Sequence, residues 1–128
     1  MTNKLRNSAL LAQRILVLEE DYFQADILAQ DLEAAGAQVM GPVPSVDAAL
    51  RLLAEQDRPD LALLDVALTG TSLLPVIKVL AAQDVPLVLT SSWRREQLPG
   101  EYAHVPLYPK PISLHELTKM FEAERSIA

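Results

Sequence analysis

The chain has 128 residues, a net charge of −6 and no cysteine. Its length suits one domain of ordinary size, and half of its residues are hydrophobic, which is enough for a normal core. The lack of cysteine excludes disulfides and thiolate metal sites and is typical of a reducing compartment, so we expect a cytoplasmic protein. The acidic charge argues against nucleic acid as a partner, because binding to phosphates needs clustered Lys and Arg. No apolar run approaches the roughly 20 residues of a membrane span.

Residues 1–14 combine basic residues with a short apolar stretch that Gln13 and Arg14 interrupt. The stretch is too short for a signal peptide, so we interpret this segment as a leader that can form a short helix. Residues 15–125 then make up the one expected domain.

This domain alternates short apolar runs with amphipathic segments. We predict buried strands at residues 15–18, 38–40, 61–65, 86–90 and 105–108. Helices are predicted between them, at residues 22–35, after Ser45, at 73–82 and after Ser113, where Ser113 and Glu116 match a capping box. The polar stretch 93–104 contains Pro99-Gly100 and lacks helical periodicity, so a fourth helix there should be short or absent.

Alternation of strands and helices predicts a doubly wound α/β fold with helices on both faces of a parallel sheet. Five strands in a chain of this length suit the flavodoxin-like order 2-1-3-4-5. In such sheets a binding site lies at the carboxyl ends of the strands, where the strand order reverses.

The residues at those ends carry the chemistry. They are Glu19, Glu20, Asp65, Thr90, Ser91 and Lys110. Carboxylates held close together repel one another, and a hard cation such as Mg²⁺ relieves that repulsion. Asp65 would then be a carboxylate nucleophile for phosphoryl transfer, with Lys110 pairing the phosphoryl charge and Ser91 donating a hydrogen bond.

These residues resemble the receiver domains of bacterial two-component response regulators over most of the chain. The segments ILVLEED, PDLALLDVAL and YPKPISLHEL carry the resemblance. It implies that Asp65 is the phospho-acceptor, that Glu19 and Glu20 are the acidic metal pair and that Ser91 is the switch hydroxyl. It also implies that Lys110 pairs with the phosphoryl group and that the Lys110-Pro111 bond is cis.

The short segment after Asp65 is similar to the alphaproteobacterial subfamily named for a Phe-Ala-Thr-Gly-X-Tyr motif. LTSSW occupies the motif, with Ser91 in place of Thr, Ser92 in place of Gly and Trp93 in place of Tyr. The implied function is a single-domain response regulator in a phosphorelay. Such a protein is a phospho-acceptor with at most weak autophosphatase activity, and its partner is a histidine kinase or a histidine phosphotransfer protein.

Two departures from the family keep a second reading open. Glu20 stands where Asp is usual, and its extra methylene moves the carboxylate outward by roughly 1.5 Å. Ala67 stands where the subfamily commonly has Asn, so only its backbone carbonyl can bind the metal. The alternative is a pseudo-receiver that acts as a binding module without phosphorylation. In the expected helix over residues 73–80, apolar side chains occupy almost every side of the helix. Such a helix predicts either a homodimer contact or unusually deep burial.

Overall fold

The structure is a computed structural model that describes residues 10–66 and 71–127, apart from the side chains of 114 and 124–127. Its strands are β1 (Arg14–Leu18), β2 (Gln38–Val43), β3 (Leu61–Asp65), β4 (Leu87–Ser91) and β5 (Leu107–Pro109). Its α-helices are α1 (Tyr22–Ala34), α2 (Val46–Glu55), α3 (Leu74–Ala82) and α4 (Leu114–Ile127). Two short 3-10 helices, η1 (Arg95–Gln97) and η2 (Gly100–Tyr102), lie between β4 and β5.

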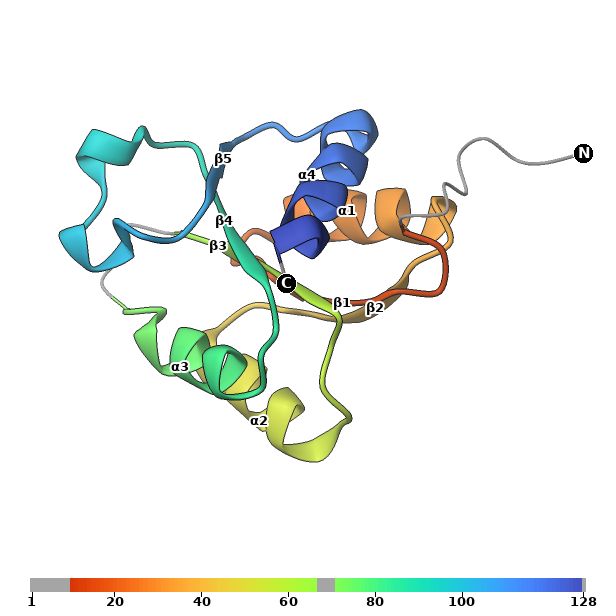
Figure 1. Ribbon diagram of the computed structural model, residues 1–128, viewed down its shortest axis with the longest axis horizontal. Helices are drawn as coiled ribbons and strands as arrows, with labels where there is room; N and C mark the ends of the chain where they lie inside the picture. The colour runs from red at the N-terminus through yellow and green to blue at the C-terminus, as the bar shows by residue number, and fades with distance from the viewer. Residues whose placement is uncertain (1–9, 67–70, 128) are drawn as a thin grey trace, which may run out of the picture.

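The five strands form one parallel sheet in the order β2-β1-β3-β4-β5, as predicted. Helices α1 and α4 cover one face of the sheet, and α2 and α3 cover the other (Figure 1). The fold is therefore the flavodoxin-like doubly wound α/β fold, and all five strands end at the same edge.

Successive residues of the central strands pack into different halves of the core, because side chains alternate along a strand. Leu16 and Leu64 lie in the cluster under α2 and α3, whereas Val17 and Leu63 lie in the cluster under α1 and α4. Burial on both faces explains why these strands are continuous apolar runs.

Two helix starts form as the sequence predicts. The Ala48 N–H donates to Ser45 Oγ at 3.1 Å at the start of α2. At the start of α4, the Glu116 N–H donates to Ser113 Oγ at 3.1 Å and Glu116 Oε1 accepts from the Ser113 N–H at 3.2 Å. These local bonds satisfy backbone donors that a helix leaves unpaired.

Strand β2 is longer than predicted, since it continues past Gly41-Pro42 to Val43. Gly41 has φ +98°, and a Cβ there would lie 2.7 Å from the Val43 nitrogen, so the bend requires glycine. The Val43 carbonyl then accepts from the Glu19 N–H at 3.0 Å. The bend therefore fixes the backbone of the first predicted site residue.

The segment between β4 and β5 forms η1 and η2 in place of an α-helix, as predicted. Arg95 donates to the Tyr102 carbonyl at 2.7 Å, and the buried Tyr102 hydroxyl accepts from the Leu73 N–H at 2.9 Å. Val105 belongs to this turn through a bond to the Tyr102 carbonyl, so β5 begins at Leu107 rather than at 105.

The remaining predictions concern the leader, the third helix and membrane spans. Residues 1–9 lie outside the described residues, residues 10–12 form a turn, and Leu10 is buried in the core. The large apolar residues of segment 73–80 are all buried or half-buried, which matches the alternative of a deeply buried helix. In the described ranges, no helix combines the length and apolar character that crossing a membrane requires.

Candidate functional site

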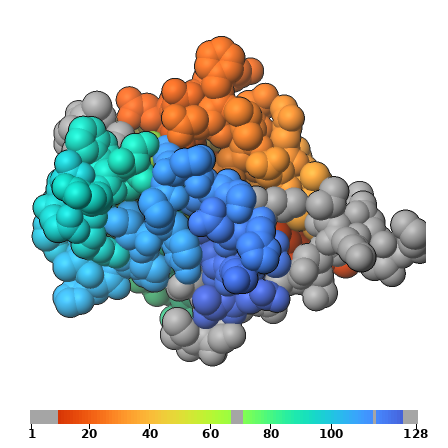
Figure 2. All heavy atoms as spheres, turned by 90° about the horizontal axis from the view of Figure 1, so that it is seen from above, coloured from red at the N-terminus to blue at the C-terminus, as the bar shows by residue number. Residues whose placement is uncertain are grey.

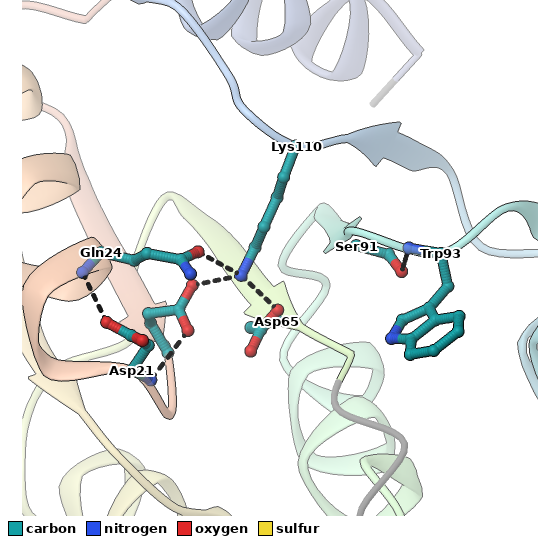
Figure 3. A network of polar contacts seen from close by, with 7 residues as sticks. Asp21, Gln24, Asp65, Ser91, Trp93 and Lys110 are labelled. Carbon is teal, nitrogen blue, oxygen red and sulfur yellow. Dashed lines mark hydrogen bonds and ion pairs between the residues drawn. The ribbon is translucent and has the colours of Figure 1, made fainter.

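Three charged side chains from three strand ends meet at the carboxyl edge of the sheet (Figure 3). Lys110 Nζ lies 2.6 Å from Glu19 Oε1 and 2.6 Å from Asp65 Oδ1. Glu19 and Asp65 are only 4% and 8% exposed. The predicted Lys110-Pro111 cis bond is present beside this site. The ammonium therefore offsets part of the negative charge of two buried carboxylates that would otherwise repel each other more strongly.

The first turn of α1 completes the surroundings of Lys110. Glu19 Oε2 accepts from the Asp21 N–H at 3.0 Å, and Asp21 Oδ1 accepts from the Gln24 N–H at 3.0 Å as the N-cap of α1. Lys110 also donates to Gln24 Oε1 at 2.9 Å. Gln24 is a site residue that the sequence analysis missed.

The pKa values of Lys110 and Glu19 are both raised, although burial acts on the two groups in opposite directions. Burial alone would lower the pKa of Lys110, but hydrogen bonds and charge attraction from Asp65 and Glu19 outweigh it and raise that pKa. Burial raises the pKa of Glu19, although bonds from Lys110 and the Asp21 N–H lower it in part. The charged form of Lys110 is therefore favoured on balance, whereas for Glu19 the cost of burial outweighs the favourable ion pair.

Glu20 and Glu19 are adjacent in the sequence but line different clefts. Glu20 is exposed and lines a cleft of about 260 Å³ together with Asp65 and Asp47. Mg²⁺ is usually held by one or two carboxylates, with water and phosphate oxygens completing its shell. Glu20 and Asp65 supply hard oxygen ligands of this kind to one open cleft, so these two residues fit the ion.

The other two predicted metal ligands, Glu19 and Ala67, are not shown to be available to an ion in this cleft. Both carboxylate oxygens of Glu19 already accept hydrogen bonds, from Lys110 and from Asp21. Ala67 lies outside the described residues. Within the described part of the chain, no three His, Cys, Asp or Glu side chains are grouped to hold a metal. The metal roles of Glu19 and Ala67 stay predictions.

The two hydroxyl residues at the end of β4 face opposite sides of the sheet. Ser91 is fully buried, and its Oγ accepts from the Trp93 N–H at 2.8 Å (Figure 3). Thr90 pairs with Asp65 in the sheet and lines a second cleft together with Glu19 and Lys110. Side-chain alternation along the strand separates the two hydroxyls, and of the two only Thr90 lines the cleft that Lys110 lines. The role of Ser91 stays a prediction.

This second cleft, of about 360 Å³, separates α1 from the segment after β5. Its apolar lining includes Ile27, Leu28 and Ile112. Figure 2 shows α1, in orange, beside the blue segments that follow β5. The exposed face of α1 also carries Tyr22 and Phe23, which are 78% and 76% exposed. An apolar surface therefore lies next to the charged site.

Comparison with known proteins finds solved structures that share this fold. No family model and no curated protein sequence matches the chain. SdrG from Sphingomonas melonis Fr1 matches with a TM-score of 0.74 and 29% identity, covering 91% of this chain and 98% of SdrG. A BeF3-activated conformation of SdrG also matches, at 28% identity.

Two further solved structures agree with this match. The PhyR response regulator REC domain of Erythrobacter litoralis matches with a TM-score of 0.76 and 21% identity, covering 93% of this chain and 94% of that one. A CheY-like receiver domain from Methylobacillus flagellatus matches with a TM-score of 0.74 and 24% identity, covering 88% and 98%.

A doubly wound sheet has its binding site at the carboxyl ends of the strands, which is where Glu19, Asp65 and Lys110 meet. The chain has the fold of response-regulator receiver domains, as its strand order and these structural neighbours show.

Proposed function

We propose that this receiver domain accepts a phosphoryl group on Asp65 from a phosphohistidine of a histidine kinase or a histidine phosphotransfer protein. The observation that carries the proposal is the contact of 2.6 Å between Asp65 Oδ1 and Lys110 Nζ at the edge of an open cleft. A carboxylate that is held in place and reachable from solvent is what phosphoryl transfer requires of its acceptor.

The transfer is a displacement at phosphorus. Because Lys110 holds Oδ1, we assign the attack to Asp65 Oδ2. The new O–P bond forms as the P–N bond to the donor imidazole breaks, and the bonding electrons return to that imidazole. The product is an acyl phosphate on Asp65 with its charge beside Lys110.

Lys110 and Thr90 stabilise the incoming charge in this proposal. The ammonium contributes a positive point charge, and the Thr90 hydroxyl lies on the same side of the sheet and can donate a hydrogen bond. Mg²⁺, when held by Glu20 and Asp65, supplies further neutralisation of the phosphoryl oxygens. Preorganised positive charge of this kind is the main contribution a protein makes to phosphoryl transfer.

The donor protein docks, in this proposal, on the exposed face of α1. Tyr22, Phe23 and Ile27 form an apolar surface beside the cleft that contains Lys110. A partner bound there brings its histidine close to Asp65. Membership of the Phe-Ala-Thr-Gly-X-Tyr subfamily is part of the same proposal and rests on the short segment between Asp65 and β4 and on the missing helix before β5.

The test is incubation with acetyl phosphate and Mg²⁺, followed by intact-mass measurement. We expect the mass of one phosphoryl group on the wild-type chain and none on Asp65→Asn. Asp60→Asn is the matched control, because Asp60 lies at the opposite end of β3 and should leave the gain unchanged. SdrG has a BeF3-activated conformation, so beryllofluoride gives a second probe, read as NMR shifts around Asp65.

A pseudo-receiver would give the opposite results. It would gain no mass from acetyl phosphate or from a kinase, and beryllofluoride would leave the spectrum unchanged. Mg²⁺ titration separates the two functions independently, since the proposed function expects binding that weakens in Glu20→Ala.

A further inference from the structure

A closed ring of hydrogen bonds joins Lys110 to the first turn of α1 (Figure 3). Lys110 donates to Glu19 Oε1, and Glu19 Oε2 accepts from the Asp21 N–H. Asp21 Oδ1 accepts from the Gln24 N–H, and Gln24 Oε1 accepts from Lys110 at 2.9 Å. The ring returns to its starting atom, so the position of the ammonium depends on α1 as well as on the two acids.

The ammonium has three N–H groups, and each has an acceptor. Glu19 and Asp65 are charged acceptors at 2.6 Å, and the Gln24 amide oxygen is a neutral acceptor at 2.9 Å. Two acceptors leave an ammonium free to rotate and tilt about the line between them. The third contact removes that freedom and fixes the direction of the N–H that faces Asp65.

Gln24 can hold this position because its own backbone is fixed. Its N–H is bonded to the N-cap Asp21, and the backbone N–H of Asp21 is bonded to Glu19. The side chain of Gln24 crosses from α1 to Lys110, which is 86 residues away in sequence. The glutamine is therefore the link between the start of α1 and the lysine at the phosphorylation site.

We propose that Gln24 is a positioning residue for Lys110, which orients the ammonium toward the phosphoryl group arriving at Asp65. This inference rests on the proposed function. Gln24 touches neither the attacking oxygen nor the phosphorus, so it acts only through Lys110.

The kinetic test compares Gln24→Leu with the wild-type chain for the initial rate of Asp65 phosphorylation by acetyl phosphate. Leucine keeps the size of the side chain and its helix propensity but accepts no hydrogen bond. We expect a rate about tenfold slower, because a misdirected charge loses part of its effect on the transition state. Gln30→Leu is the matched control, since Gln30 is an exposed glutamine of the same helix that bonds only to Asp26 among the contacts described.

A spectroscopic measurement separates positioning from a general effect on folding. The side-chain ¹⁵N–¹H signal of the Lys110 ammonium, assigned by its loss in Lys110→Met, should exchange slowly with water in the wild-type chain. In Gln24→Leu it should broaden or shift, and in Gln24→Glu it should persist because the carboxylate is again an acceptor. Gln30→Leu should leave it unchanged.

The outcomes distinguish this inference from the proposed function. If the wild-type chain is phosphorylated and Gln24→Leu reacts at the same rate or faster, the positioning role is wrong while the proposed function stands. If the wild-type chain accepts no phosphoryl group, the proposed function fails. The Lys110 ammonium signal is then the remaining test of the positioning role. If that signal is the same in Gln24→Leu as in the wild-type chain, the positioning role is wrong.

Discussion

The two ends of the sheet both carry charged networks, but they differ in burial. At the amino end, the Arg14 N–H donates to Asp60 Oδ2 at 2.8 Å, and the Arg14 guanidinium donates to the Asp57 carbonyl at 3.0 Å, all in contact with solvent. At the carboxyl end, Lys110 holds two nearly buried carboxylates at 2.6 Å.

The difference in burial indicates different roles for the two networks. Water can replace an exposed hydrogen bond at little cost, so the amino end stabilises the fold modestly. Buried charges are expensive, and apolar residues of similar size often stabilise a fold as well or better. Two buried carboxylates and a half-buried lysine at one edge are therefore better explained by chemistry than by stability, which is the strongest physical reason to place the proposed function there.

The largest effect we expect is from Lys110→Met, which leaves Glu19 and Asp65 buried without a counter-charge. Breaking a buried pair in this way typically costs about 3–5 kcal/mol of unfolding free energy. The measurement is urea unfolding at neutral pH. The added change Glu19→Gln should recover part of the loss, because it removes one of the two uncompensated charges.

The matched control for this prediction is Lys78→Met, at an exposed lysine of α3. It should change the unfolding free energy by less than about 0.5 kcal/mol, as most surface substitutions do. A loss of similar size in both variants would mean that the buried network is not special.

A smaller effect is expected in the pH dependence of stability. The pKa of Glu19 is raised above its ordinary value of 4.5, so the folded chain binds this proton more tightly than the unfolded chain. The stability from this group is complete below 4.5 and is lost as the pH rises through the folded pKa. The raised pKa of Lys110 affects stability in the same direction but at a higher pH. Its contribution to stability is complete below 10.5 and is lost as the pH rises through the folded pKa.

The measurement is urea unfolding of the wild-type chain and of Glu19→Gln from pH 4.5 to neutral pH. The wild type should gain stability relative to Glu19→Gln as the pH falls. The opposite slope would show that Glu19 is an ordinary stabilising carboxylate, and the contrast between the two ends would weaken.

Local rules made much of the fold predictable from the sequence. The capping box of Ser113 and Glu116 spans four residues, and Asp65 ends a short apolar run typical of a buried strand. Alternation of strands and helices then determines a parallel sheet, and the sheet brings its carboxyl ends together. The meeting of Glu19, Asp65 and Lys110 follows from those steps without any knowledge of side-chain packing.

The parts that escaped prediction depend on contacts between distant residues or on one residue of register. Nothing near Gln24 in the sequence indicates Lys110, because the contact forms only when α1 and the segment after β5 pack together. Thr90 and Ser91 are adjacent hydroxyls, and only their side of the strand decides which one lines the cleft with Lys110. The extension of β2 beyond Gly41-Pro42 depends on a left-handed glycine, which its pattern of residues did not show.

The smallest effect we expect from a change in either charged network is that of Asp60→Ala at the amino end. The substitution removes the carboxylate that accepts from the Arg14 N–H, but water reaches this exposed donor and replaces the bond. The unfolding free energy should therefore fall by about 0.5–1 kcal/mol, with the urea m-value unchanged. Phosphorylation of Asp65 should keep its wild-type rate, since the change lies at the far end of β3. A loss as large as that of Lys110→Met would contradict the contrast, because a solvent-exposed network would then stabilise the fold as strongly as the buried one.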